Sequence, residues 1–478
     1  MNRSIAKLFT VVIVLFAALI AWTSRWTVFE ATALQNDPLN KLAYFASLKV
    51  KRGQILADNG KVLAESVPAP GGLWNRRYPT GPLFAQPIGY SIVSEGQAAG
   101  LEQFRSNALG GTLRTGLSSV FGPLSTQSVG DDVYTTLDPK AQQLARTQLA
   151  GRIGSVVAIV PQTGAIKVMY SNPDYNDNDP SAKCAGCSQY AGVTQGLYPP
   201  GSTFKVVTTT AALGSGAYTP DSTIVGDSPL TVSGRPLEND GNQSWGPVSL
   251  RTALTNSINT VYAQVGLRLG RQTMETYMRR FGFYSTPPLD FPTGQMSVSG
   301  NWLIAKHSRL LPVTNDNVDL GRMSIGQAKL LVTPLQMAMV VAAVADNGRL
   351  MAPRLTSRVV NQDGQVVESF PPQLYSEVMK PQVAHELGGM MTDVVEEGTG
   401  QAARLDGVSV AGKTGTASTG GYSNGQPLDD AWFIGFAPVG DPKIAVAVTL
   451  ENIPNGYGGI YAAPIAAQEI KTLLAEGK

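Results

Sequence analysis

The hydrophobic pattern of this chain begins with one long apolar run near its N-terminus. Residues 8–24 are seventeen uncharged residues, mostly Val, Leu, Ile, Phe and Ala, and Arg3 and Lys7 precede them. This length is near the lower limit for crossing a bilayer, and basic residues before such a run favour a cytoplasmic N-terminus. Because no small-x-small cleavage site closes the run, an uncleaved anchor is favoured over a removed signal peptide. We expect residues 1–25 to form a cytoplasmic tip and one transmembrane helix.

The pattern of residues 26–150 is one of short strands and turns. Two apolar stretches in residues 52–63 flank Asn59-Gly60, and this pair is expected to supply both positive-φ positions of a tight hairpin turn. The Pro- and Gly-rich residues 67–72 interrupt regular structure, and residues 131–137 resemble a strand. Asp138-Pro139 begins a helix that runs to Ala150. Reactive side chains do not gather here, so packing or partner binding is the expected role.

Residues 151–478 have strands at both ends and helices between them. Apolar segments at 155–160 and 165–170 flank one turn, and segments at 431–437 and 444–450 flank another. The segment Pro334–Ala345 is typical of the helices between them. Distant strands covered by helices predict the α+β class, with one antiparallel sheet and helices on both of its sides.

Composition narrows the possible chemistry. A length of 478 residues favours two or three folded units, and 43% hydrophobic residues suffice for their cores. A net charge of +2 without a basic run argues against nucleic acid as the main partner. The sequence contains two histidines, His307 and His385, so a nucleophile is expected to depend on another kind of base. No cofactor and no metal is predicted.

The first segment with reactive potential is residues 198–205, Tyr-Pro-Pro-Gly-Ser-Thr-Phe-Lys. A helix-compatible run begins at Ser202, and the free N–H groups of a helix N-terminus favour developing negative charge. Lys205 lies one turn away on the same face, where a desolvated lysine can act as the base that a serine nucleophile needs. An isolated Ser-x-x-Lys is more often a helix-capping serine beside a surface lysine.

The second segment contains Ser257, 55 residues after Ser202, and Asn259 two residues later. In an extended loop, side chains at positions i and i+2 point the same way, so both are expected to converge on one site. Ser257 is suited to relay a proton and Asn259 to hold the substrate backbone or the lysine. Without the other segments this is little more than a turn motif.

The third segment is residues 408–416, expected to be a strand with glycines on either side of Lys413 and Thr414. Glycine in a strand indicates close approach of another backbone, as a pairing peptide substrate would require, although an edge strand with a protective lysine is the ordinary alternative. Together, Ser-x-x-Lys, Ser-x-Asn and Lys-Thr-Gly in this order are the set that penicillin-binding proteins share with class A β-lactamases.

From residue 151 onward the chain resembles the transpeptidase domain of class B penicillin-binding proteins. Residues 52–63 and Gly100-Leu101-Glu102 resemble the N-terminal pedestal of the same proteins, and the short pedestal resembles that of an actinobacterial subgroup. The likeness beyond the three motifs lies in residues 323–327, 333–338, 347–348, 397–400, 411–417 and 431–436. It implies an anchor (1–25), a pedestal or dimerisation-like domain (26–150) and a transpeptidase domain (151–478) with the serine penicillin-recognising fold.

The resemblance also implies a role for each motif residue. Ser202 would be acylated by the D-Ala-D-Ala end of a peptidoglycan stem peptide or by a β-lactam antibiotic, with Lys205 as general base. Ser257 would relay a proton, with Asn259 as its partner. Lys413 and Thr414 would bind the substrate carboxylate, and Gly415 and Thr416 would also contact the substrate. The amides of Ser202 and Thr416 would form the oxyanion hole.

Two features depart from the family pattern. The pedestal residues Ala57-Asp58-Asn59 lack an arginine often found between the aspartate and the asparagine. The pair Cys184-x-x-Cys187 in the loop before Ser202 is not a general family feature. Closure of the loop by a disulfide is favoured over a redox role for this pair.

Enzymes with related activities are expected to have other sequence features. A class A β-lactamase needs a glutamate-held water, and the residues after Ser202 contain Glu238 but no Glu-x-x-Leu-Asn. A D,D-carboxypeptidase or a scaffold that is acylated without turnover are the remaining alternatives, although a scaffold would be expected to lose some of the motif residues. The roughly 125 residues between anchor and residue 151 are too few for a glycosyltransferase. The membrane, a separate SEDS-family lipid-II polymerase and other cell-wall or division proteins are therefore the expected partners.

Overall fold

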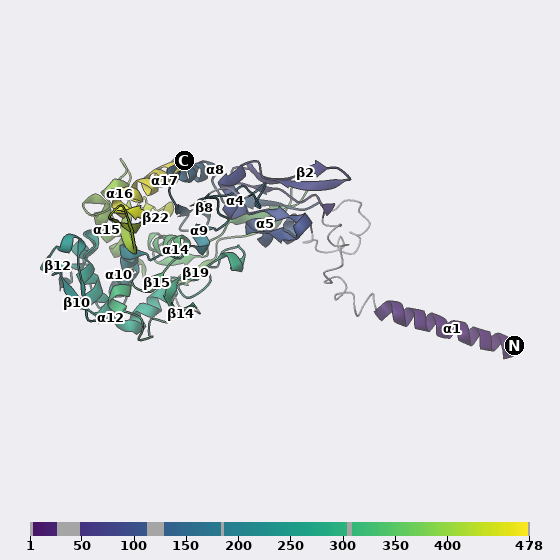
Figure 1. Ribbon diagram of the computed structural model, residues 1–478, viewed down its shortest axis with the longest axis horizontal. Helices are drawn as coiled ribbons and strands as arrows, with labels where there is room; N and C mark the ends of the chain where they lie inside the picture. Colours follow the sequence, from purple (N-terminus) through teal and green to yellow (C-terminus); the bar gives the residue numbers. More distant parts are fainter. Residues whose placement is uncertain (1–2, 26–47, 112–128, 183–185, 304–307, 477–478) are drawn as a thin grey trace.

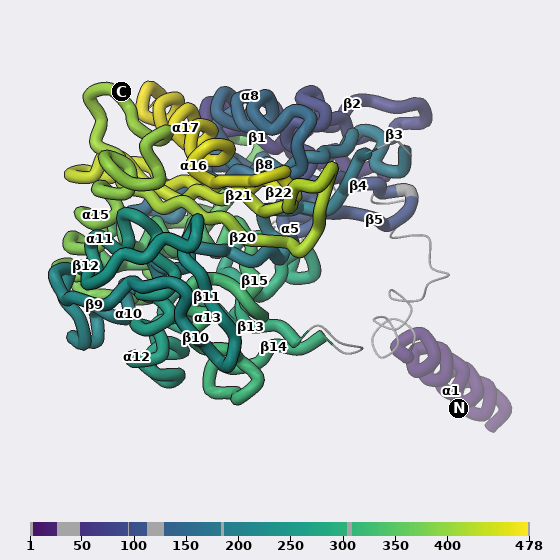
Figure 2. Tube along the Cα trace, turned by 60° about the vertical axis from the view of Figure 1, so that its left-hand side comes forward, coloured from purple at the N-terminus to yellow at the C-terminus, as the bar shows by residue number. Residues whose placement is uncertain are grey.

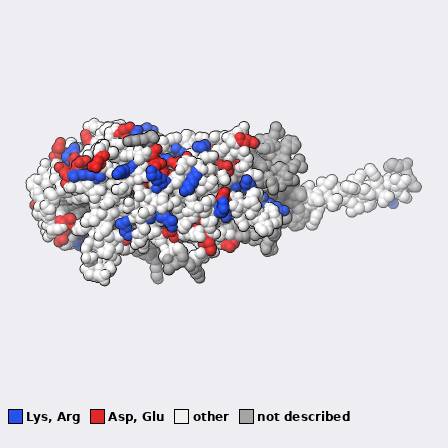
Figure 3. Space-filling model, turned by 90° about the horizontal axis from the view of Figure 1, so that it is seen from above, with Lys and Arg blue, Asp and Glu red and all other residues white. Residues whose placement is uncertain are grey.

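The N-terminal helix is separate from the rest of the protein. The structure, a computed structural model, describes residues 3–25, 48–111, 129–182, 186–303 and 308–476. Helix α1 (Arg3–Ser24) lies apart in Figure 1, and none of its residues is buried. Its 22 residues include a window with a mean hydropathy of 2.5, and Figure 3 shows it almost without charged side chains. These properties suggest a membrane anchor.

The sheet of the C-terminal part has five strands in the order β20-β21-β22-β7-β8, and every neighbouring pair is antiparallel. Its strands therefore come from the two ends of this part of the chain, as the sequence predicts (Figure 2). The bounds are β7 (Gly154–Ile159), β8 (Ile166–Asn172), β20 (Ala411–Ser423), β21 (Gln426–Ala437) and β22 (Ile444–Pro454).

Helices cover both faces of this sheet, which confirms the predicted α+β class. Successive side chains of a strand point to opposite faces. Val157 therefore packs in the core that contains α14 (Pro334–Ala345), and Val156 in the core that contains α8 (Pro139–Gln148) and α17 (Ala463–Glu476). All residues of α14 are buried, and its bounds are those predicted, because Thr333 caps its first turn and Asn347 adopts a positive φ after its end.

Further helices and small strands complete the C-terminal part. The remaining helices are α9 (Gly192–Gln195), α10 (Lys205–Gly214), α11 (Leu250–Thr255), α12 (Asn259–Arg280), α13 (Leu320–Met323), α15 (Pro381–Glu396) and α16 (Gly458–Tyr461). The small strands are β9 (Thr223–Val225), β10 (Leu230–Val232), β11 (Arg235–Leu237), β12 (Pro247–Ser249), β13 (Gly300–Leu303), β14 (Arg309–Leu311), β15 (Leu330–Leu331), β16 (Arg349–Met351) and β19 (Leu374–Glu377).

A second sheet has the order β18-β17-β6-β1-β2-β3 and combines distant parts of the chain. Its strands are β1 (Ile55–Leu56), β2 (Val62–Ala69), β3 (Leu73–Arg77), β6 (Asp132–Thr135), β17 (Thr356–Val360) and β18 (Val366–Ser369). β17 and β18 follow α14 in sequence, so the later part of the chain completes the N-terminal sheet. Nearby lie β4 (Ser91–Ile92), β5 (Gln97–Ala98), α4 (Ala85–Ile88), α5 (Gly100–Phe104) and α6 (Ser106–Leu109).

The two N-terminal segments with family resemblance meet at Glu102. This wholly buried side chain of α5 accepts hydrogen bonds from Arg52 and Arg76. Burial alone would raise the pKa of Glu102, but the charges of Arg76 and Arg52 hold it below its ordinary value. Removal of Glu102 would leave the largely buried charges of Arg52 and Arg76 without their carboxylate, so the triad fixes α5 to the segment just before β1 and to β3.

Two predictions for the N-terminal part were wrong in detail. Only Gly60 has a positive φ at the hairpin turn, where Gly60 N donates to Ala57 O at 3.0 Å, so the turn is longer than a two-residue one. Residues 67–69 belong to β2, and Gly71-Gly72 makes the turn. Beyond Ala64, no strand of the described residues pairs with the β1 side of β2, and such an edge tolerates Pro68.

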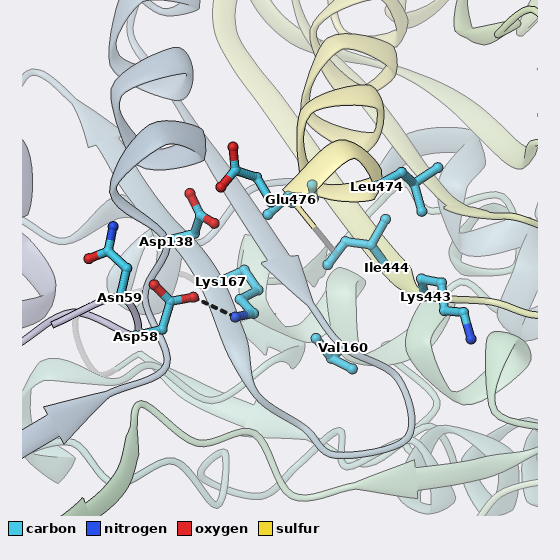
Figure 4. A pocket seen from close by; sticks show the side chains of 10 residues that line it. Asp58, Asn59, Asp138, Val160, Lys167, Lys443, Ile444, Leu474 and Glu476 are labelled. Carbon is cyan, nitrogen blue, oxygen red and sulfur yellow. Dashed lines mark hydrogen bonds and ion pairs between the residues drawn. The ribbon is translucent and has the colours of Figure 1, made fainter. Parts of the chain in front are cut away.

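A cavity of about 370 Å³ lies where the N-terminal hairpin meets the C-terminal part (Figure 4). Asp58 Oδ2 accepts a hydrogen bond from Lys167 Nζ at 2.6 Å across it. Asp138, the cap of α8, and Glu476, at the end of α17, also line this cavity. None of the residues in the three sequence motifs lines it, so this cavity is part of the junction and separate from the predicted site.

Glu469 of α17 makes stability depend on pH. Its side chain is wholly buried, and neither carboxylate oxygen has a hydrogen-bond partner within the described ranges. Burial, and then the charge of Asp138, raises the pKa of Glu469 to about 9. Between its ordinary pKa of 4.5 and this value, the folded chain holds a proton that the unfolded chain has lost. This carboxyl group therefore makes stability fall as the pH rises through that window.

We expect Glu469→Gln to raise the thermal unfolding midpoint at pH 8 by several degrees, from a gain on the order of 2 kcal/mol, with little effect at pH 5. The matched control is Glu476→Gln, on the same helix but exposed and paired with Lys140, for which a small effect at both pH values is expected. An equal shift of the Glu469→Gln midpoint at both pH values would contradict the titration.

Candidate active site

The predicted nucleophile lies in a short 3₁₀ turn, Gly201–Phe204, and Lys205 is the first residue of α10. Side chains three residues apart eclipse in a 3₁₀ turn, so Ser202 and Lys205 leave the backbone in the same direction. Ser202 is half-buried, whereas Lys205 is wholly buried. The side chain of Ser202 has no hydrogen-bond partner in the part of the chain that the structure describes.

Close backbone contacts fix the turn that carries Ser202. Gly201 N donates to Gly326 O at 3.0 Å, and a Cβ on Gly326 would lie 1.9 Å from Gly201 O. A Cβ on Gly415 would lie 2.8 Å from Pro200 O. The backbone of Pro200 therefore lies against the face of β20 at Gly415, and Gly415 does not line the cavity. β20 is the last strand of its sheet among the described strands, so the expected pairing of a substrate along its edge stays a prediction.

The segment before the turn is attached to the sheet. Tyr198 exchanges two backbone hydrogen bonds with Val332, and its hydroxyl donates to Glu451 Oε1 of β22 at 2.7 Å. The rings of Tyr198 and Trp432 meet edge to face, 6.2 Å between centroids. These contacts hold the segment that precedes Ser202 against the sheet.

Ser257 lies at a corner between two helices and not in the extended loop expected from the sequence. It separates α11 from α12 and has a φ of +58°, and Asn259 is the first residue of α12. A positive φ is strained for a residue other than glycine and occurs mostly where the surroundings impose it, often at functional sites. The corner turns the Ser257 and Asn259 side chains toward Lys205.

A hydrogen-bonded chain joins the three motifs. Lys205 Nζ lies 2.6 Å from Ser257 O, 2.8 Å from Asn259 Oδ1 and 3.2 Å from Ser257 Oγ. Lys413 Nζ of β20 donates to the same Ser257 Oγ at 3.0 Å and to Thr414 O at 3.0 Å. Ser257 therefore links the two lysines.

Burial lowers the pKa of both lysines from the ordinary value of a lysine. Burial, reinforced by the charge of Lys413, holds the pKa of Lys205 well below its ordinary value. Burial lowers the pKa of Lys413 to about 7. A neutral Lys205 has two N–H groups, and its two carbonyl-type acceptors, Ser257 O and Asn259 Oδ1, can use both. Its lone pair is then free to receive a proton.

A cavity of about 780 Å³ adjoins this chain, and residues of β20 and of the start of α12 are among those that line it. The predicted residues Ser202, Ser257, Asn259, Thr414 and Thr416 line it, while Lys205 and Lys413 lie beneath. A Cβ on Gly201 would lie 2.6 Å from Thr416 O and 3.2 Å from Thr416 N, so the backbones beside the two expected oxyanion amides touch.

The sequence analysis missed several residues that line this cavity. Gln327 and Thr399 occur in segments with family resemblance, which is the signal that could have identified them. Asp240 and Tyr457 carried no such signal, because they meet only in the folded chain, where the Tyr457 hydroxyl donates to Asp240 Oδ1 at 3.3 Å. The acidic side chains among the lining residues are Glu238, Asp240 and Asp429.

The cysteine pair is only partly described. Cys187 is disulfide-bonded, and Cys184 lies outside the described residues. The adjoining residues attach the loop to its surroundings, since Asn178 Nδ2 donates to Tyr78 O at 2.9 Å and the Tyr175 hydroxyl to Ala85 O at 2.8 Å.

Family models match two parts of the chain. Residues 154–471 match the penicillin-binding protein transpeptidase domain, and residues 52–127 match the penicillin-binding protein A dimerisation domain. The chain is 34% identical to peptidoglycan D,D-transpeptidase PbpA of Mycolicibacterium smegmatis and 32% identical to PbpA of Mycobacterium tuberculosis; the first match covers 100% of both chains, and the second covers 99% of both.

The fold of the chain is also similar to solved structures of penicillin-binding proteins. Penicillin-binding protein A from M. tuberculosis, solved as a ceftriaxone acyl-enzyme complex, superposes with a TM-score of 0.78 at 30% identity, covering 90% of this chain and 99% of that one. The D,D-transpeptidase domain of a peptidoglycan glycosyltransferase from Eggerthella lenta superposes with a TM-score of 0.76 at 28% identity, covering 90% and 99%. The predicted likeness to the actinobacterial subgroup is confirmed, and the chain belongs to the penicillin-binding protein transpeptidase family.

Proposed function

We propose that this chain is a peptidoglycan D,D-transpeptidase that cross-links stem peptides through an acyl-enzyme on Ser202, and that β-lactams acylate the same serine. The observation that carries the proposal is the chain Lys413–Ser257–Lys205 beneath the cavity that Ser202 lines. A serine needs a nearby base, and a buried lysine with a lowered pKa supplies one without histidine. Family membership gives independent support.

In acylation, Ser202 Oγ attacks the carbonyl carbon of the penultimate D-Ala and its proton passes to Lys205. The amides of Ser202 and Thr416 stabilise the resulting oxyanion. The tetrahedral intermediate then expels the terminal D-Ala, whose nitrogen receives a proton through Ser257. Lys413 and Thr414 hold the carboxylate of that terminal residue. In a β-lactam the same attack opens the ring, and the leaving nitrogen stays tethered to the acyl group.

In the second half-reaction, an amine of a neighbouring stem peptide attacks the ester of Ser202. The amine loses a proton to Lys205, and Ser202 Oγ leaves as the restored hydroxyl. The new amide bond is the cross-link, and Lys205 passes the proton taken from the amine to Ser202 Oγ as it leaves, so Lys205 is neutral again at the end of the cycle. Water in place of the amine would make the chain a D,D-carboxypeptidase, and no second step would make it a non-turnover scaffold.

We further propose a single-pass topology with the catalytic domain outside the cytoplasm. The apolar helix α1 and the basic residues Arg3 and Lys7 before its core support this orientation. The chain would then work beside a SEDS-family lipid-II polymerase that supplies nascent strands, with residues 26–150 as a pedestal. Protease added to spheroplasts is expected to digest this chain down to its anchor.

The test of the proposed function is cross-linking in a defined system. We expect the full-length protein in detergent, incubated with lipid II and a SEDS-family polymerase, to yield cross-linked muropeptide dimers. Omission of the polymerase, or the substitution Ser202→Ala, should abolish the dimers. Release of D-Ala without dimers would identify a carboxypeptidase, and polymer made by this chain alone would contradict the proposed partner.

A further inference from the structure

Two threonine hydroxyls form a pair on the cavity wall. Thr399 Oγ1 lies 2.6 Å from Thr414 Oγ1, and both residues line the cavity that contains Ser202. Thr399 belongs to none of the three motifs and follows α15 in the chain. Its place beside Thr414 is therefore a product of the tertiary structure.

Backbone contacts on both sides hold Thr399 in place. Its N–H donates to Thr255 O at 3.3 Å, two residues before Ser257, and a Cβ on Gly398 would lie 2.3 Å from the same oxygen. On the other side, a Cβ on Gly459 of α16 would lie 2.3 Å from Thr399 O. Thr399 is thus fixed between the Ser257 corner and α16, and its hydroxyl is positioned before any ligand binds.

A count of protons shows what ligand the pair can bind. Each hydroxyl has one proton, and their mutual hydrogen bond uses one of the two. Whichever hydroxyl donates within the pair, the other keeps one O–H for a group in the cavity. Lys413 Nζ lies 3.5 Å from Thr414 Oγ1, so a protonated Lys413 places positive charge next to the threonine pair. A free donor beside a cation favours an anionic acceptor, and hydrogen bonds to a charged acceptor are the strong ones.

We infer that Thr399 is a further substrate-binding residue, which holds the terminal carboxylate of the donor peptide, or of a β-lactam, together with Thr414 and Lys413. The inference rests on the proposed function, because it names the group of the donor that this wall of the cavity recognises. It makes Thr399 a determinant of selectivity for donors with a free carboxylate over neutral analogues.

The experiment compares acylation of the full-length protein by penicillin G and by its methyl ester, which differs only in lacking the anionic carboxylate. Thr399→Val keeps the shape of the side chain and removes the hydroxyl. We expect this variant to lower the second-order rate of acylation by penicillin G about 10- to 100-fold, the range for a lost hydrogen bond to a charged group. The rate with the methyl ester should change less than about threefold, because the ester oxygens carry no charge.

Two further variants complete the design. Thr399→Ser restores the hydroxyl and should recover most of the penicillin G rate. Thr419→Val removes the hydroxyl of an exposed threonine on the same strand as Thr414, which donates to Leu428 O and accepts from Gly421 N, and it should leave both rates unchanged. If Thr399→Val lowered the acylation rates with penicillin G and with its methyl ester equally, or lowered neither, the inference about Thr399 would be wrong and the proposed function would still stand. A wild-type protein acylated by neither probe would overturn the proposed function as well.

Discussion

Substitution of Ser202 by alanine is expected to abolish covalent labelling of the protein by a fluorescent penicillin. The side chain lines the cavity above Lys205, Ser257 and Lys413, and the other hydroxyls of that group already serve as hydrogen-bond partners. Without Ser202 Oγ there is no atom to form the ester, so the loss should be complete and not partial. Mass spectrometry of the wild type should find one penicilloyl group per chain, on the peptide that contains Ser202.

The control for this prediction is Ser215→Ala, an exposed serine at the end of the same helix α10, which should label like the wild type. The thermal unfolding midpoint of Ser202→Ala should stay within a few degrees of the wild-type midpoint, because the substitution removes a half-buried hydroxyl that has no hydrogen-bond partner among the described residues. An adduct on another residue, or persistent labelling of Ser202→Ala, would refute the assignment of the nucleophile.

Loss of the Lys205 amine should reduce the rate of acylation at least about 1,000-fold, toward the upper end of what a general base contributes. Lys205→Met removes the amine at similar length, and Lys205→Arg keeps the charge but cannot give up its proton. Both variants should fold, because Ser257 and Asn259 can still bond elsewhere, and stopped-flow measurement of penicillin acylation gives the rate. Labelling of either variant at near the wild-type rate would exclude Lys205 as the base.

The pH profile of the wild type should report the same pair of lysines. A lysine with a lowered pKa must lose its proton to act as base, so the second-order rate should rise as Lys205 deprotonates. The rate should fall again as the pH passes about 7, where Lys413 loses the charge that binds the carboxylate. The rising and falling parts of the rate profile reflect the coupled titration of Lys205 and Lys413, and the rising part should be absent from the profile of Lys205→Met. Lys443→Met, at an exposed lysine paired with Asp441, is the matched control and should keep the bell-shaped profile.

The sequence by itself determined the features that depend on neighbours along the chain. Thr333 and Asn347 set the ends of α14, and Asp138 caps α8 by accepting from Lys140 N and Ala141 N. The apolar run of α1 and the continuous apolar run that gives β7 two buried faces can likewise be read from local pattern. Hydrogen bonds within a turn and the period of a strand act over a few residues, so a sequence pattern is enough to predict them.

The three motifs were also recognised from the sequence, but not the geometry that joins them. Ser257 adopts its left-handed conformation because two helices meet there, and no local signal distinguishes that corner from an extended loop. Gly415 was expected to mark the close approach of another backbone, and the structure identifies Pro200 O as one such neighbour. Neither feature could be read from local sequence, since the partner of each residue lies far away in the chain.

Only the tertiary structure decided how the site works. Packing brings Ser257 Oγ within 3.2 Å of Lys205 Nζ and 3.0 Å of Lys413 Nζ, although 156 residues separate Ser257 from Lys413. Packing also places Thr399 against Thr414 and adds β17 and β18 to the N-terminal sheet. The lowered pKa values of the two lysines follow from the removal of water around them, and water is removed only when the whole core has assembled. The sequence therefore determined which groups take part, and burial by distant segments determined their protonation and their partners.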